Sequence, residues 1–211
     1  MNEIVQQIGQ TGIIAIIVID KAQDAIPLGE AFLDGGLFCV EVTFRTAAAA
    51  EAIHNLTTTY PEMLVGAGTI LTIEQAAAAA AAGAKYMLSP GYDEAILDWC
   101  QARQILFIPG VMTPSEILRG YNKGVSLLKF FPAAAAGGPK AIQAIAGPLP
   151  EVKLLPTGGI NTNNLADYLR LSLVHACGGS WLATRQQIAQ QQFAQISQQA
   201  AEAVTIVQNS R

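Results

Sequence analysis

The sequence predicts an α/β fold, a compact (β/α)8 barrel closed by a C-terminal amphipathic helix. Eight apolar runs of strand length recur roughly every 20–27 residues, the length of one strand–helix unit. Alanine-rich segments with helical periodicity separate consecutive runs. No linker or change of composition divides the 211 residues, so we expect one domain over 1–211 with the barrel at about 12–182.

The expected strands are continuous apolar runs, as is typical of parallel strands that are buried on both faces. In order they are GIIAIIVI from residue 12, LFCVEVTF from 37, MLVGAG from 63, KYMLSP from 85, ILFIPG from 105, SLLKFFP from 126, VKLLPTGG from 152 and VHACGGS from 174. The first run is far too short to cross a bilayer, which needs about 20 apolar residues.

Capping signals mark the helices between these strands. TIEQAAAAAAAG has Thr72 as N-cap with Gln75 three residues later, and it ends at Gly83. TPSEILRGYNKG begins with Thr113 as N-cap, proline at the first helical position and Glu116 at the third. After the barrel, 186–208 has apolar residues on one helical face and predicts a final helix packed against it.

Composition excludes several classes of partner. Net charge is −4 and the basic residues are scattered, which predicts no binding of nucleic acid or of a membrane surface. Charged residues make up 13% of the chain, against about 25% in typical domains, which suggests surface buried in an oligomer. Three distant cysteines and an N-terminus without signal-peptide features suggest a cytoplasmic protein. Two histidines make a histidine-based metal site improbable.

Lys129 is the first candidate for chemistry, because it stands in the apolar run SLLKFFP. It shares strand parity with Leu127 and Phe131, so all three would point into the barrel. A lysine nucleophile forms a Schiff base with a carbonyl substrate, and burial disfavours its ammonium form. The alternative is a lysine whose stem packs on apolar surface while its amine reaches water. Lys85 and Lys153 lie at strand starts, the face associated with stability.

Polar residues also gather where the second and third strands end. Glu41, Thr43 and Arg45 share parity, so a carboxylate and a guanidinium would line the barrel interior, with Arg45 near the lysine. A buried structural ion pair is the alternative interpretation. Thr69 ends the third strand at the rim where barrel enzymes place their chemistry.

Glycines follow the last two strands, at Gly158–Gly159 and at Gly178–Gly179 before Ser180. Loops at these positions commonly hold phosphate through backbone N–H groups, although the glycines could also merely turn the chain. The third glycine of the dinucleotide-binding fingerprint, a Walker sequence and a Ser–His–Asp arrangement are all missing. We therefore expect no cofactor and no metal.

Several motifs, in this order, resemble the 2-keto-3-deoxy-6-phosphogluconate (KDPG) / 4-hydroxy-2-oxoglutarate (KHG) aldolase family. They are VEVTFRT, GAGTI, LSPG, IPGV, LKFFPA, LPTGGI and GGSWL. The resemblance implies a class I aldolase, a homotrimer that works on a small 2-keto acid phosphate and belongs to the Entner–Doudoroff pathway of carbohydrate metabolism.

The resemblance also implies residue roles. Lys129 would form the imine and Glu41 would be the acid–base residue; Arg45 and Thr69 would hold the pyruvate-like carboxylate. The pocket and phosphate residues would be Pro90, Phe131, Gly158, Gly159, Gly179 and Ser180. One departure stands out, since Ala134 occupies the position where the family usually has glutamate.

Alternatives remain open at this point. The substrate could belong to the galactonate series, as 2-keto-3-deoxy-6-phosphogalactonate. A phosphate-binding barrel isomerase could use Glu41 as base with no covalent intermediate. A non-catalytic barrel could serve as a binding subunit.

Overall fold

The computed structural model describes residues 3–211, in which parallel strands alternate with helices. The strands are β1 (Ile13–Ile17), β2 (Cys39–Thr43), β3 (Leu64–Gly68), β4 (Tyr86–Leu88), β5 (Leu106–Ile108), β6 (Gly110–Val111), β7 (Leu128–Phe130), β8 (Leu154–Pro156) and β9 (Cys177–Gly179). The helices are α1 (Glu3–Thr11), α2 (Ala25–Asp34), α3 (Ala49–Thr59), α4 (Ile73–Ala81), α5 (Glu94–Gln101), α6 (Pro114–Asn122), α7 (Gly138–Ala146), α8 (Leu165–Leu169), α9 (Arg185–Ala189) and α10 (Phe193–Ser210).

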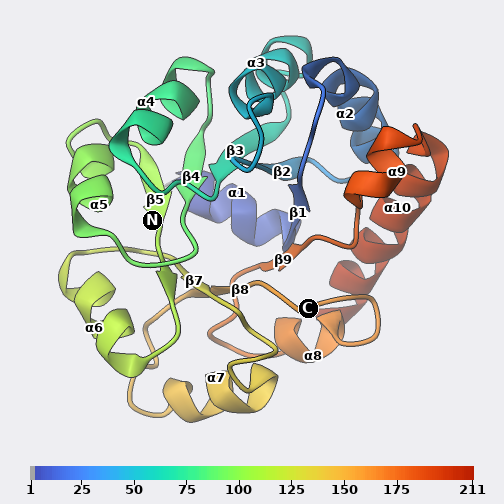
Figure 1. Cartoon of the computed structure of the whole chain (residues 1–211). Coiled ribbons are helices and arrows are strands. Elements are labelled where there is room, and N and C mark those ends of the chain that lie inside the picture. Colours follow the sequence, from blue (N-terminus) through green and yellow to red (C-terminus); the bar gives the residue numbers. More distant parts are fainter. Residues whose placement is uncertain (1–2) are drawn as a thin grey trace.

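The strands close into a barrel that the helices surround as a ring (Figure 1). One sheet has the order β5-β4-β3-β2-β1-β9 and the other β6-β7-β8. Only Pro109 separates β5 from β6, so the two form one interrupted strand that joins the sheets. On the other side, bridges at Leu154–Val174 and Thr157–Gly178 link β8 to the β9 segment. The predicted (β/α)8 barrel is confirmed.

Alternating side chains separate two apolar layers. Residues that point inward form a small cluster inside the barrel, among them Ile14, Cys39, Tyr86, Leu127 and Leu155. Their neighbours along the strands point outward and pack under the helices, for example Val40 and Phe130. This alternation fixes which side of each strand faces the barrel interior.

Helix α1 closes the amino end of the barrel, where it lies behind the strands in Figure 1. Its Val5 and Ile8 are fully buried in the inner cluster. His175, just before β9, pairs a ring nitrogen with the Val5 carbonyl at 2.7 Å. The guanidinium of Arg211 donates to the carbonyls of Gly9 and His175, so α1 and Arg211 meet here.

The half-buried His175 makes stability depend on pH. Burial lowers the pKa of His175 from 6.5, and the charges of Lys153 and Arg211 lower it further, against the raising effect of the Val5 carbonyl. The native state therefore binds fewer protons than the unfolded state as pH falls through about 6.5. We expect Tm to fall between pH 7.5 and pH 5.5, and to fall less in His175→Gln. The matched control is His54→Gln, a substitution of the exposed histidine. An equal change of Tm with pH in His175→Gln and in the wild type would contradict the prediction.

The predicted helix starts agree with the structure, and the predicted C-terminal helix is present as α10 but with different bounds. The hydroxyl of Thr72 accepts from the Gln75 amide, and Thr113 forms a full capping box with Glu116. The single helix expected over 186–208 is instead two helices, α9 and α10, separated at residues 190–192. Gln191 there has a φ of 53°, which breaks the helix. No helix among residues 3–211 has the length and hydropathy to cross a bilayer.

Candidate active site

A buried ion pair lies inside the barrel near the carboxyl ends of the strands. Lys129 on β7 donates to Glu41 on β2, with Nζ 3.1 Å from Oε1 and 3.4 Å from Oε2. Lys129 is 5% exposed and Glu41 0%. The parity argument therefore placed both side chains correctly on the inner face. Desolvating two charges is expensive, so a buried ion pair inside the barrel is unusual.

Glu41 reaches Lys129 across the barrel, because β2 and β7 are separated by β1, β9 and β8. A glycine makes this path possible. A Cβ at Gly68 on the neighbouring strand β3 would overlap the Glu41 carboxylate. The carboxylate thus lies over the backbone of β3, in space that any side chain at 68 would fill. Thr43, one inward position further along β2, is held by its bond to the Ile17 carbonyl at 2.9 Å.

Apolar and polar groups pack around the pair. The ring of Phe131 lies with its centroid 5.8 Å from Lys129 Nζ. Deeper in the barrel, the Tyr86 hydroxyl donates to the Val40 carbonyl at 2.8 Å and lies 3.2 Å from Cys39 Sγ. Burial raises the pKa of Cys39 to about 12 and the pKa of Tyr86 well above its usual value. Both groups therefore stay neutral beneath the ion pair at physiological pH.

Arg45 differs from its predicted position. The strand ends at Thr43, so the alternation that would turn Arg45 inward does not extend to it, and its side chain is exposed. The neighbour of the Lys129 amine is the Glu41 carboxylate and not the Arg45 guanidinium we expected. Among residues 3–211, Arg45 has no ion-pair partner. A free guanidinium after β2 remains available to a ligand carboxylate.

Two other predicted residues lie on loops at the same end of the barrel. Thr69 follows β3 with a φ of 58°, a conformation rare for a β-branched residue. Strain of this kind clusters at functional sites. Pro90 follows β4, half-buried, and its carbonyl packs so closely on Gly110 that no Cβ would fit there.

The Gly158–Gly159 loop follows β8 as predicted, whereas Gly178 and Gly179 lie within β9 and only Ser180 follows that strand. Gly158 and Gly159 have φ values of 96° and 78°, which favour glycine. A Cβ at Gly158 would contact the Phe131 ring, so this loop adjoins the Lys129 pocket. Ser180 is exposed at the end of β9, where its hydroxyl has no hydrogen-bond partner in the described part of the chain. Gly179 lies within β9 itself, against the Trp181 ring.

Sequence reasoning missed Thr157. Its hydroxyl is buried and finds no partner within residues 3–211, and the side chain is 6% exposed. Thr157 shares parity with Leu155 of the inner cluster and lies against Gly178, so it faces the barrel interior. The same alternation that identified Lys129 could have identified it. A buried hydroxyl without a partner suits a polar group of a ligand.

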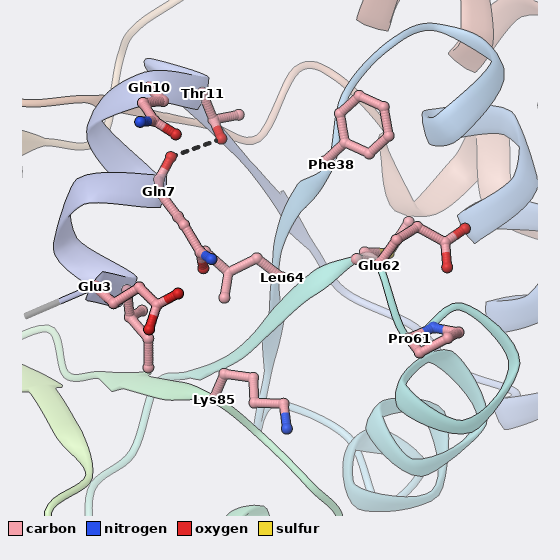
Figure 2. Close-up of a pocket in the computed structure, with 11 residues that line it drawn as sticks. Glu3, Gln7, Gln10, Thr11, Phe38, Pro61, Glu62, Leu64 and Lys85 are labelled. Atoms are coloured by element: carbon pink, nitrogen blue, oxygen red, sulfur yellow. Dashed lines mark hydrogen bonds between the residues drawn. The ribbon is translucent and has the colours of Figure 1, made fainter.

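A separate hollow lies at the opposite end of the barrel (Figure 2). It encloses about 570 Å³ between α1 and the starts of β2, β3 and β4, with Glu3, Gln7, Phe38, Glu62 and Lys85 around it. It contains neither the Lys129–Glu41 pair nor a glycine loop. Catalytic residues of (β/α)8 barrels come from the carboxyl ends of the strands, so we place the candidate site at Lys129. No cluster in the described chain could hold a metal ion.

Comparison with known proteins identifies the family of the chain. The family described as KDPG and KHG aldolase matches residues 4–199. A 2-dehydro-3-deoxy-phosphogluconate aldolase of Treponema pallidum is 41% identical over 98% of this chain and 99% of its own. The KHG/KDPG aldolase of Escherichia coli is 42% identical over 91% of this chain and 90% of its own.

A solved structure gives the same result. The KDPG aldolase of Legionella pneumophila, captured with pyruvate as a covalent carbinolamine intermediate, superposes with a TM-score of 0.92. It is 40% identical and covers 96% of this chain and 98% of its own. The family suggested by the sequence motifs is therefore confirmed, and the chain belongs to the KDPG and KHG aldolase family.

Proposed function

We propose that the protein is a class I aldolase, a lyase that cleaves KDPG to pyruvate and glyceraldehyde 3-phosphate through a Schiff base on Lys129. The observation that carries the proposal is the buried Lys129–Glu41 pair, an amine and a carboxylate 3.1 Å apart at the carboxyl end of the barrel. The similar proteins reported above are named aldolases, and the one from Legionella pneumophila was captured with pyruvate as a covalent carbinolamine. The same site could also cleave KHG.

The pair accounts for each proton transfer. Glu41 takes a proton from the Lys129 ammonium, and the neutral amine attacks the C2 keto carbon to give a carbinolamine. The carbinolamine loses water, with Glu41 returning the proton to its hydroxyl, and leaves an iminium. Glu41, which is again a carboxylate, then takes the C4 hydroxyl proton. The C3–C4 bond breaks, glyceraldehyde 3-phosphate leaves, and the electron pair of the broken bond enters the iminium to form an enamine. Protonation at C3 and hydrolysis release pyruvate and restore Lys129.

Other residues would hold the rest of the substrate. Arg45 has no ion-pair partner within residues 3–211, and Thr69 follows the strand that carries Gly68, so both suit the carboxylate next to the keto carbon. Phe131 and Pro90 would flank the reacting carbons and exclude water. The backbone N–H groups of Gly158, Gly159 and Gly179, together with the Ser180 hydroxyl, would bind the phosphate.

A phosphorylated substrate should therefore be preferred. Phosphate is remote from the breaking bond, so its binding energy helps to position C2 at Lys129. We expect kcat/KM for KDPG to exceed that for KHG by a wide margin in steady-state assays. Gly159→Val should remove most of the preference, because its φ of 78° strains a β-branched residue and its side chain would overlap Ala134. Covalent trapping of pyruvate should survive this change.

A control separates local strain from lost phosphate binding. Gly124 has a φ of 73°, but a Cβ there meets no atom within 4 Å, and it precedes β7 at the opposite end. Gly124→Val should carry similar backbone strain and keep the substrate preference. Equal kcat/KM for KDPG and KHG in the wild type would show that the glycines only turn the chain.

The other functions considered have less support. An isomerase would need no amine beside the carboxylate, and a binding barrel would not need to bury an ion pair. The galactonate-series substrate differs in configuration at C4, and assays with both epimers would decide between them. The homotrimer and the cytoplasmic location stay predictions; the solution mass, expected at three times 22.2 kDa, tests the first.

A further inference from the structure

The loop that follows β9 carries the free Ser180 hydroxyl, and it is anchored away from the candidate site. A Cβ on Gly179 would overlap the benzo edge of the Trp181 ring, so the indole packs directly on the strand end. The Trp181 carbonyl accepts a hydrogen bond from Gln199 Nε2 of α10 at 3.4 Å. The C-terminal helix thus contacts the backbone one residue beyond Ser180.

A chain of amides continues from Gln199 back to the same loop. Gln187 Nε2 of α9 donates to Gln199 Oε1 at 2.8 Å. Gln187 Oε1 in turn accepts from the Thr184 amide at 3.0 Å and from the Thr184 hydroxyl at 2.9 Å. The two glutamines therefore join both ends of the 181–184 segment to α9 and α10.

An ion pair holds Arg185, the residue that directly follows the 181–184 segment. Arg185 donates from Nε and from a terminal nitrogen to the two carboxylate oxygens of Asp20, each at 2.6 Å. This two-point contact ties the first residue of α9 to the loop after β1. None of these anchoring side chains is among the residues placed in the catalytic or phosphate-binding set.

We propose that Gln199 is a positioning residue that holds the Ser180 loop in the geometry required for the substrate phosphate. The proposal deepens the function proposed above and rests on it. A hydroxyl and backbone N–H groups bind phosphate well only when they are fixed beforehand, because ordering the loop on binding would reduce affinity. The C-terminal helix thereby contributes to selection of phosphorylated substrates without touching them.

Gln199→Glu tests the proposal because it removes only one of the two bonds. The carboxylate can still accept from Gln187, but it can no longer donate to the Trp181 carbonyl. We expect KM for KDPG to rise by about three- to ten-fold, the effect of one lost hydrogen bond. kcat for KDPG, kcat/KM for KHG and borohydride trapping of pyruvate should stay unchanged. The non-phosphorylated substrate is the internal comparison, since a general loss of structure would reduce both activities.

Two further variants complete the experiment. Gln198→Glu places the same charge at the exposed neighbouring position, so it should leave both substrates unaffected. Gln199→Met keeps the side-chain length but loses both bonds, and should raise KM for KDPG at least as much as Gln199→Glu. Unchanged KM in both Gln199 variants, or equal changes for KDPG and KHG, would overturn the inference. A wild-type enzyme that cleaves neither substrate would instead overturn the proposed function.

Discussion

Lys129→Arg is expected to reduce aldolase turnover below detection and to abolish covalent trapping of pyruvate. Arginine keeps the positive charge that pairs with Glu41, but its guanidinium stays protonated and cannot form an imine. The change therefore removes the chemistry while it preserves the ion pair. The measurement is intact mass after incubation with pyruvate and borohydride, together with a steady-state assay on KDPG.

Peptide mapping of the wild type locates the label. A reduced adduct on Lys129 blocks tryptic cleavage there, so a single modified peptide from Gly124 to Lys140 should appear. Lys153→Arg is the control, since Lys153 lies before β8 and bonds to the Ser172 carbonyl at 3.4 Å. Label on Lys153 or Lys85, or continued trapping in Lys129→Arg, would contradict the assignment.

Glu41→Gln is expected to lower kcat by about 10²–10⁴-fold, the usual contribution of a general acid–base group. Glutamine keeps the shape of the side chain and its position over Gly68, but it cannot take up a proton from the amine. Imine trapping should continue at a reduced rate, because Lys129 remains in place. Rapid-quench trapping measured beside steady-state kcat separates the two steps.

One result would contradict the assignment of Glu41 as the acid–base residue. Near-normal kcat in Glu41→Gln would reduce Glu41 to a structural partner of Lys129. Glu116→Gln serves as a matched control, because this carboxylate caps α6 by accepting from the Met112 and Thr113 amides. That control should lower Tm and leave kcat unchanged.

Strand parity explains why much of the site could be predicted from the sequence. Alternation along one continuous strand places Lys129 beside Leu127 on the inner face, and the structure agrees. The same rule failed at Arg45, because β2 ends at Thr43 and the chain turns there, with the Arg45 amide donating to the Thr43 carbonyl. The rule applied to β8 would have included Thr157.

Other features depend on three-dimensional contacts that no local pattern encodes. The path of Glu41 across the barrel requires an empty Cβ position at Gly68 on β3, a strand that does not pair with the β7 strand of Lys129. The break between α9 and α10 falls within a run of glutamines, without the glycine or proline that usually marks such a break. Sequence reasoning therefore extended one helix where the chain forms two.

The buried Lys129–Glu41 pair places stability and activity in opposition. Replacing a buried ion pair with well-packed apolar residues often stabilises a fold by about 1–4 kcal/mol, whereas removing one partner alone destabilises it by about 3–5 kcal/mol. Single substitutions that remove one of the two charges thus lose both activity and stability, and only a double change to apolar residues reaches the more stable barrel. A more thermostable apolar barrel could therefore be reached through single substitutions only by way of an intermediate that is both less stable and less active. That loss of folding free energy favours retention of the catalytic pair.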